Sequence, residues 1–387
     1  MAAESFIPYG RQWIDADDER AVLATLRSSF LVQGPTAAQF EADLAAYVGA
    51  RFAVAVSNGT AALHLTMAAL ELGPGEGITT PITFVATANA MAYVGLTPVF
   101  ADIDPETLNL SPAAARAAMT SRTRVIAPVH FAGRPADMVA FREMVDGTGV
   151  RIVEDAAHAI GSEYQNGKVG DCRHSDATIF SFHPVKTMTT GEGGAVTTND
   201  PELYERLVLL RSHGITRDPA RLSEQPGTWW YEQQMLGFNY RMTEMQAALG
   251  RSQLKKLDRF IDRRIAIFDR YRAAFADLDW LRLPQPQGAD RIGFHLFVVQ
   301  IDFERIGRTR AEVMAALAAV GVGSQVHYIP VPRQPWYRKT YGEPKAFPAA
   351  DRYYETALSL PLFPAMTDEE VERVIAAVES LSPGGAA

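Results

Sequence analysis

The chain contains 387 residues, with a hydrophobic content of 47% and a formal net charge of −8 at pH 7. This length suits two domains and a large apolar core, and the acidic balance argues against a nucleic-acid partner because no basic excess is available to neutralise phosphates. The single cysteine, Cys172, excludes disulfides and cysteine-based metal sites within one chain.

The sequence shows neither a signal-peptide pattern nor a membrane-spanning pattern. The first eight residues lack the basic start and apolar core of a signal peptide. No stretch approaches the ~18 uninterrupted apolar residues that a membrane span needs. We therefore expect a cytoplasmic protein without a membrane partner.

The first part of the chain alternates between helical and strand patterns. Asp15 can cap the first predicted helix, Thr83 can cap the fourth, and residues 73–77 are predicted to form a glycine-rich loop. This alternation predicts a mostly parallel sheet with helices on both faces. The predicted helices cover residues 15–28, 37–48, 61–70, 83–90 and 112–119, and the predicted strands cover 52–56, 98–103, 124–130 and 150–153.

The second part of the chain is predicted to contain the remaining elements and a domain boundary. A long amphipathic helix over residues 244–275 is expected to bridge two domains, which gives a large domain at 1–260, a small domain at 261–380 and a disordered tail at 381–387. The other predicted strands are 177–180, 195–198, 295–300, 324–328 and 358–361, and the other predicted helices are 201–212, 309–320 and 367–380.

An anion site is one interpretation of the residues that follow the first predicted strand. Ser57, Asn58, Gly59 and Thr60 lead from this strand into a helix, an arrangement that presents free backbone amides and the positive helix end to a phosphate. The same residue types also cap helices and form turns, so this stretch alone favours a structural role. Phe84 can offer a flat face to an aromatic ring or pack in the core.

Two acidic residues, Glu154 and Asp155, directly follow the predicted strand at 150–153. Ligands gather at the carboxyl ends of parallel strands, and buried acids need a partner such as a protonated ring nitrogen. Asp155 could instead cap a helix or accept a bond from a nearby amide, and His158 could be an ordinary core or loop histidine. A metal site is not expected, because Asp155 and His158 lack a third ligand at suitable spacing.

Lys186 lies on a predicted loop between two strands, and Gly191, Gly193 and Gly194 follow it. Most lysines are solvated surface charges. A lysine among apolar neighbours, however, loses its proton more easily and can attack a carbonyl to form an imine. The anion cradle, the strand-end acid and this lysine together make up the set that pyridoxal phosphate requires.

These motifs resemble those of the DegT/StrS family of nucleotide-sugar aminotransferases over nearly the whole chain. The resemblance rests on Glu154-Asp155-Ala156-Ala157-His158, Ser181-Phe182-His183-Pro184-Val185-Lys186 and Gly191-Glu192-Gly193-Gly194. It implies the fold-type-I aminotransferase architecture, an α/β fold with a mostly parallel seven-stranded sheet, flanking helices and a smaller C-terminal α/β domain. It also implies pyridoxal 5′-phosphate as the cofactor.

The resemblance further implies a role for each matching position. Lys186 would hold the cofactor and move the proton, Asp155 would pair with the pyridine nitrogen, and His158 would contact the ring hydroxyl. The other implied contacts are Phe84 stacked on the ring, Gly59, Thr60 and Ser181 at the phosphate, Asn239 reaching the phosphate of the neighbouring subunit in a homodimer, and His213, His327 and Tyr328 at the substrate.

Within this family the chain is similar to the transaminases of the pseudaminic acid pathway at residues 212–217, 230–233 and 252–258. That likeness implies amino transfer from L-glutamate to the 4-keto carbon of a UDP-linked 4-keto-6-deoxy-N-acetylhexosamine, in the synthesis of cell-surface or secondary-metabolite sugars. A dTDP-linked or 3-keto sugar remains an alternative substrate. A sugar dehydratase would carry histidine in place of Lys186, and a non-catalytic regulator on the same fold is the remaining alternative.

Overall fold

The computed structural model of the chain describes residues 6–382. Leu381, in the predicted disordered tail, is packed in the core at 3% exposure. Residues 383–387 of that tail lie outside the described part of the chain, as do residues 1–5 of the N-terminal segment, which is predicted to lack a signal peptide.

Within the described residues, a seven-stranded sheet has the strand order β1-β9-β8-β5-β4-β2-β3. The pairs β1–β9 and β9–β8 are antiparallel, and the other four pairs are parallel, which confirms the prediction of a mostly parallel sheet. Its strands are β1 (Phe52–Val56), β2 (Gly75–Thr79), β3 (Leu96–Phe100), β4 (Thr123–Ala127), β5 (Arg151–Asp155), β8 (Ala177–Ser181) and β9 (Gly194–Thr198).

Strand β2 occupies part of the segment that the sequence predicts to be a loop. A Cβ atom at Gly77 would lie 2.6 Å from the sulfur of Met91 and 3.1 Å from Val125, so this position of the strand needs glycine for close packing. One of the glycines that suggest a loop, Gly77, therefore allows helix α4 (Ala86–Tyr93) to pack against a buried strand.

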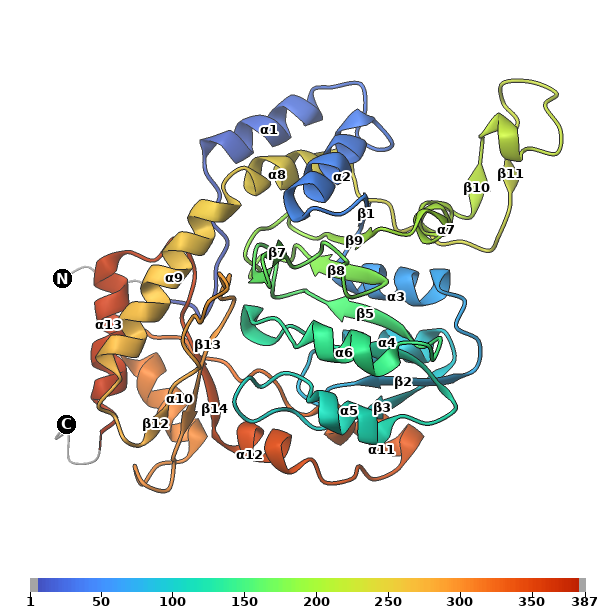
Figure 1. Cartoon of the computed structure of the whole chain (residues 1–387). Coiled ribbons are helices and arrows are strands. Elements are labelled where there is room, and N and C mark those ends of the chain that lie inside the picture. Colours follow the sequence, from blue (N-terminus) through green and yellow to red (C-terminus); the bar gives the residue numbers. More distant parts are fainter. Residues whose placement is uncertain (1–5, 383–387) are drawn as a thin grey trace.

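Helices cover both faces of the sheet (Figure 1). Helices α3, α4 and α7 pack with one apolar core, whereas α2 and α8 and, separately, α5 and α6 pack with two others. We call this sheet and its helices the large unit. Besides α4, its helices are α1 (Ala16–Leu26), α2 (Pro35–Val48), α3 (Gly59–Ala69), α5 (Pro112–Ala118), α6 (Met138–Val145), α7 (Pro201–Arg211) and α8 (Glu244–Leu254).

Two predicted helix starts have different outcomes. Asp15 caps α1 as predicted, because its carboxylate accepts hydrogen bonds from the backbone N–H groups of Asp17 and Asp18. The prediction that Thr83 caps a helix is wrong, because α4 begins only at Ala86. The hydroxyl of Thr83 instead lies 2.9 Å from that of Thr87.

The long helix predicted over residues 244–275 is two helices, α8 and α9 (Leu257–Ala274). At the break between them, Lys256 forms ion pairs with Asp15 and Asp18 at 2.7 and 2.6 Å. These contacts fix the break beside the start of α1.

A smaller sheet with the order β12-β13-β14 packs with α9, α10 and α13 around a separate apolar core. We call these elements the small unit. The prediction of a strand at residues 324–328 is wrong, because this segment contributes only an isolated bridge between Gln325 and Ser359 on one edge of β14, whereas β13 pairs continuously with β14 on the other edge. Besides α9, its elements are β12 (Leu281–Arg282), β13 (Phe297–Ile301), β14 (Ala357–Leu360), α10 (Arg310–Ala319) and α13 (Asp368–Glu379). Helices α11 (Pro335–Tyr341) and α12 (Pro348–Thr356) pack with two other apolar clusters.

The N-terminal segment joins the small unit rather than the large one. Ile7 donates a backbone hydrogen bond to Gly321 O and accepts one from Gly323 N, both at 2.8 Å, and Leu362 N donates to Tyr9 O at 3.1 Å. Tyr9 is thereby fixed against the C-terminal half of the chain.

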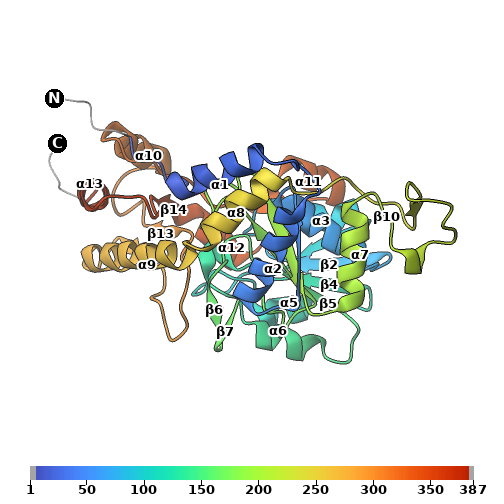
Figure 2. The same ribbon diagram turned by 90° about the horizontal axis from the view of Figure 1, so that it is seen from above.

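Two short hairpins complete the fold: β6 (Glu163–Tyr164) with β7 (Gly167–Lys168), and β10 (Ile215–Thr216) with β11 (Glu232–Gln233). The second hairpin and its loop form an arm that projects far from the body of the molecule (Figure 2). No helix among residues 6–382 is both long and apolar enough to cross a bilayer.

Candidate active site

The predicted site residues converge on a cavity of about 860 Å³ at the carboxyl ends of the parallel strands. Lys186 reaches it from the loop between β8 and β9, and Asp155 reaches it from the last position of β5. Because β5 and β8 are parallel neighbours in the sheet, their ends deliver these two side chains to the same edge.

The two adjacent acids at the end of β5 have separate partners. Asp155 accepts hydrogen bonds from the hydroxyl of Thr87 at 2.7 Å and from the N–H of Ala157 at 3.1 Å. Glu154 contacts His130 at 2.8 Å and accepts a hydrogen bond from Thr178 at 2.9 Å. Since successive strand residues point to opposite faces, only Asp155 faces the cavity.

The surroundings of Lys186 favour the uncharged form of its amine. Its side chain is partly buried in the cavity wall, and burial lowers its pKa to about 8, although the negative charge of Asp155 opposes this shift. A lysine ordinarily titrates above pH 10. At neutral pH an appreciable fraction of Lys186 is therefore deprotonated and nucleophilic.

The predicted phosphate cradle is formed by the start of α3 and the end of β8. Asn58 caps α3 by accepting a 2.7 Å hydrogen bond from Ala61 N, so Gly59 and Thr60 lie in the first turn, where backbone N–H groups lack intrahelical partners. A Cβ atom at Gly59 would lie 2.8 Å from Cβ of Ser181. The glycine thus permits the close approach, and this geometry fits a phosphate group.

Phe84 and His158 stand where the cofactor ring would need an apolar face and a polar edge. Phe84 lines the cavity and is 59% exposed, which is unusual for a large apolar side chain and leaves a ring face available for stacking. His158 is buried, and its Nε2 lies 3.1 Å from the hydroxyl of Tyr328. Burial, with the nearby charge of Lys186, holds the pKa of His158 well below its usual value.

Nine of the eleven predicted site residues line this cavity, including His327 and Tyr328 from the C-terminal half. Asn239 and His213 do not line it, and both are exposed. They lie close together on neighbouring segments, because His213 N donates a 2.7 Å hydrogen bond to Phe238 O. Within a single chain, these two side chains are therefore separate from the site.

The cavity also contains residues that the sequence analysis did not select. Tyr9 comes from the N-terminal segment and His295 lies two residues before the start of β13, and both are distant in sequence from the lysine motif. His295 begins a predicted strand, and a histidine directly before an apolar run is the signal that could have found it. The other unselected polar residues of the wall are His64, Thr83, Thr87, Tyr93, His183, Glu192 and Tyr240. Among residues 6–382, no group of three or more His, Cys, Asp or Glu side chains could hold a metal ion.

Comparisons with known proteins find aminotransferases, which agrees with the geometry of this site. The DegT/DnrJ/EryC1/StrS aminotransferase family model matches residues 12–379. The chain is 43% identical over 382 residues to the spore coat polysaccharide biosynthesis protein SpsC of Bacillus subtilis, with 98% of each chain covered.

Solved structures give the same result. PseC of Helicobacter pylori, an aminotransferase involved in the biosynthesis of pseudaminic acid, aligns with a TM-score of 0.90 and 31% identity over 97% of this chain and 99% of its own. The putative sugar aminotransferase Spr1654 of Streptococcus pneumoniae, solved in its PLP form, aligns with a TM-score of 0.89 and 29% identity over 99% and 100% of the two chains. The chain therefore belongs to the DegT/DnrJ/EryC1/StrS aminotransferase family, has the fold-type-I architecture and uses pyridoxal phosphate as its cofactor.

Proposed function

We propose that this enzyme transfers the amino group of L-glutamate to the 4-keto carbon of a nucleotide-linked 4-keto-6-deoxy-N-acetylhexosamine, with UDP as the nucleotide. The observation that carries the proposal is that Lys186, whose pKa is lowered by burial, and Asp155 line the same large cavity. The similarity to PseC supports the choice of sugar, and the similarity to SpsC supports a role in making surface polysaccharides.

We assign a separate role in this reaction to each residue of the site. Pyridoxal phosphate supplies an aldehyde that can carry an amino group and a ring that can accept electrons. We assign to Lys186 attachment of the cofactor and transfer of the proton at the reacting carbon, because its amine is available near neutral pH. Asp155 would pair with the pyridine nitrogen, and His158 would contact the ring hydroxyl. Phe84 would cover one ring face, and Gly59, Thr60 and Ser181 would hold the phosphate.

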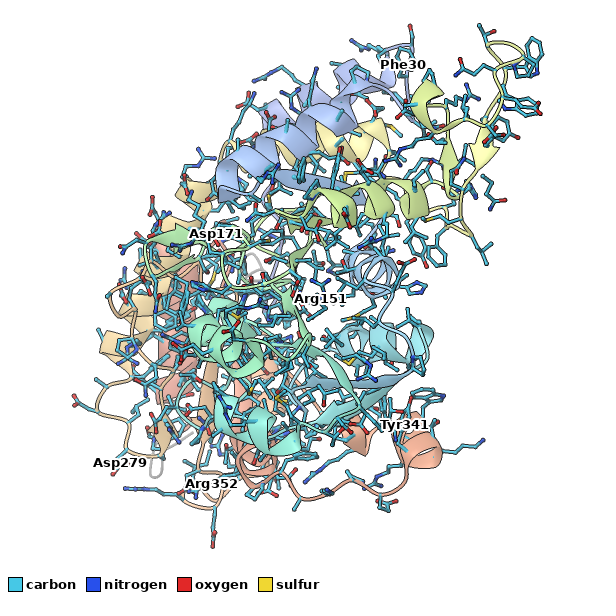
Figure 3. All side chains as sticks on the ribbon, turned by 45° about the vertical axis from the view of Figure 1, so that its right-hand side comes forward. Phe30, Arg151, Asp171, Asp279, Tyr341 and Arg352 are labelled. Carbon is cyan, nitrogen blue, oxygen red and sulfur yellow. The ribbon has the colours of Figure 1, made fainter. Side chains whose placement is uncertain are left out.

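We also propose a homodimer with shared active sites. Asn239 is exposed and lies outside the cavity of its own chain, as expected for a side chain that reaches a second copy. Phe30 and Trp229 are 53% and 68% exposed, and Phe30 lies at the same end of the molecule as the β10–β11 arm (Figure 3). A second copy covering this end would bury these side chains.

Turnover with a panel of UDP- and dTDP-linked 4-keto sugars, with glutamate as the donor, tests the proposed substrate. We expect a visible absorption band from the bound cofactor, loss of this band on addition of glutamate, and fastest turnover with the UDP-linked N-acetylhexosamine. Preference for a dTDP-linked sugar would overturn the substrate. A protein that stays colourless after addition of the cofactor would support a regulator instead.

A further inference from the structure

The polar wall of the cavity carries little fixed positive charge. Among the described residues that line it, Lys186 is the sole lysine and arginine is absent. Three of the histidines in this wall, His158, His295 and His327, are buried. Burial lowers the pKa of each of them, and the charge of Lys186 lowers these pKa values further. All three are therefore uncharged at neutral pH.

His295 differs from the other two histidines in its hydrogen bonding. His158 has Tyr328 as a partner for Nε2, and His327 has Ser359 as a partner for Nδ1 at 2.8 Å. Nδ1 of His295 is buried without a hydrogen-bond partner, as is Nδ1 of His158, and no hydrogen bond joins Nε2 of His295 to the described residues, although the side chain is only 4% exposed. An unpaired polar group in such a position is costly, so a packing role alone would favour an apolar residue there.

The backbone fixes His295 firmly in this position. His295 N donates a 2.8 Å hydrogen bond to Ala132 O, and the buried guanidinium of Arg264 donates to His295 O at 3.2 Å. Gly133 lets these segments meet, because a Cβ atom there would lie 3.0 Å from His295 N. The ring is held 4.4 Å from the ring of His158, measured between centroids.

We propose that His295 is a substrate-facing residue that hydrogen-bonds a carboxylate of the amino donor in one half of the reaction and an uncharged polar group of the keto sugar in the other. This proposal rests on the proposed function, in which one cavity receives an amino dicarboxylate and a sugar in turn. An arginine would suit the dicarboxylate but would be left as a buried unpaired charge beside the sugar. A neutral imidazole offers one donor and one acceptor and suits both ligands.

Binding of glutarate, a dicarboxylate that lacks an amino group, tests the proposal by calorimetry on the cofactor-loaded protein. Loss of a hydrogen bond to a charged group predicts that His295→Leu weakens glutarate binding roughly 10- to 100-fold. His295→Gln keeps a donor and an acceptor and should restore most of the affinity. His174→Leu is the matched control, because His174 does not line the cavity. Cofactor affinity should stay the same in all three variants.

A His295→Leu protein that binds glutarate as tightly as the wild type would overturn the proposal, even if its melting temperature falls. If the leucine variant does not fold, nitrogen-15 NMR of histidine-labelled wild-type protein decides the question. The signals that disappear in His295→Gln must move when glutarate is added, and unmoved signals would overturn the proposal. A wild-type cofactor band that does not respond to glutamate would instead count against the proposed function itself.

Discussion

The hydroxyl of Thr87 donates a 2.7 Å hydrogen bond to the carboxylate of Asp155, and both side chains are buried. A hydroxyl has one proton, and Thr87 gives it to the carboxylate. The neighbouring hydroxyl of Thr83, 2.9 Å away, must therefore donate to Thr87. This directed chain from Thr83 through Thr87 orients the carboxylate that we assign to the pyridine nitrogen.

Replacing Thr87 with valine should weaken cofactor binding by roughly 5- to 100-fold, because loss of one hydrogen bond to a buried charged group costs about 1–3 kcal/mol. Equilibrium dialysis with pyridoxal phosphate measures the change. Thr66→Val is the matched control, since Thr66 is equally buried but its hydroxyl donates to Ala62 O within α3. If the two variants retain the cofactor equally well, Thr87 has no positioning role.

Lys186 should react as a free amine at a lower pH than an ordinary lysine. Its pKa is lowered to about 8, so its reactivity in the cofactor-free protein should rise through pH 8 and then level off. Trace acetylation followed by peptide mass spectrometry measures this profile, with the exposed Lys255 as an internal reference for the reagent. A reactivity of Lys186 that keeps rising beyond pH 10 would show that burial does not lower its pKa.

The same pKa shift predicts how the stability of the cofactor-free protein changes with pH. The folded pKa of about 8 lies below that of an unfolded lysine. Between these two values the unfolded chain binds more protons than the folded one, so Lys186 should make the protein more stable as pH rises through this window. Comparing the wild type with Lys186→Met by chemical denaturation at pH 8 and pH 10 checks the sign. A Lys186 contribution that falls with pH would contradict it.

Glu244 stabilises the fold by capping a helix that is distant in sequence. Its carboxylate is fully buried and accepts hydrogen bonds from Thr36 N at 2.6 Å and Ala37 N at 3.3 Å, at the start of α2. Gly34, the N-cap residue of α2, supplies no side chain for this purpose. Glu244→Ala should therefore lower the free energy of unfolding by about 1–3 kcal/mol.

Chemical denaturation measures this loss, and Glu244→Gln should lose less because it keeps an acceptor. The exposed Glu143 on α6 provides a control, since Glu143→Ala should change stability by at most about 0.5 kcal/mol. Equal effects of Glu244→Ala and Glu143→Ala would rule out the capping role.

Mixed dimers test whether Asn239 acts in the neighbouring active site. We expect Lys186→Ala and Asn239→Ala to be strongly impaired as separate proteins. If Asn239 reaches across to the partner, a mixed dimer contains one site with both changes and one site with neither, so mixing should restore activity. If Asn239 serves its own site, both sites carry a change and mixing should restore nothing.

Sequence patterns located most of the elements that carry the site. The apolar strand at residues 52–56, the turn that follows it and the lysine loop between β8 and β9 are local features, and each occurs where it was predicted. Strand β2 was missed because Gly77 serves packing against Met91, a contact that is made only in the folded protein. The break between α8 and α9 was missed for a similar reason, since it is fixed by ion pairs with Asp15 and Asp18, which are distant in sequence.

The residues that sequence reasoning missed at the site come from distant parts of the chain. Tyr9 reaches the cavity because the N-terminal segment pairs with the small unit, and His295 because the segment before β13 contacts Ala132. No motif in the sequence shows that either residue enters the site, although an apolar run follows His295. Their placement depends on contacts between units, which local patterns do not encode.

The attachment of the cofactor to Lys186 is the central claim, and it can be measured directly. The loaded protein is reduced with borohydride and digested, and its peptides are weighed by mass spectrometry. The account predicts the mass of the reduced cofactor on the peptide that contains Lys186, and its loss in Lys186→Ala. The reduced cofactor on another lysine, or on no peptide of a protein that binds it, would contradict the account.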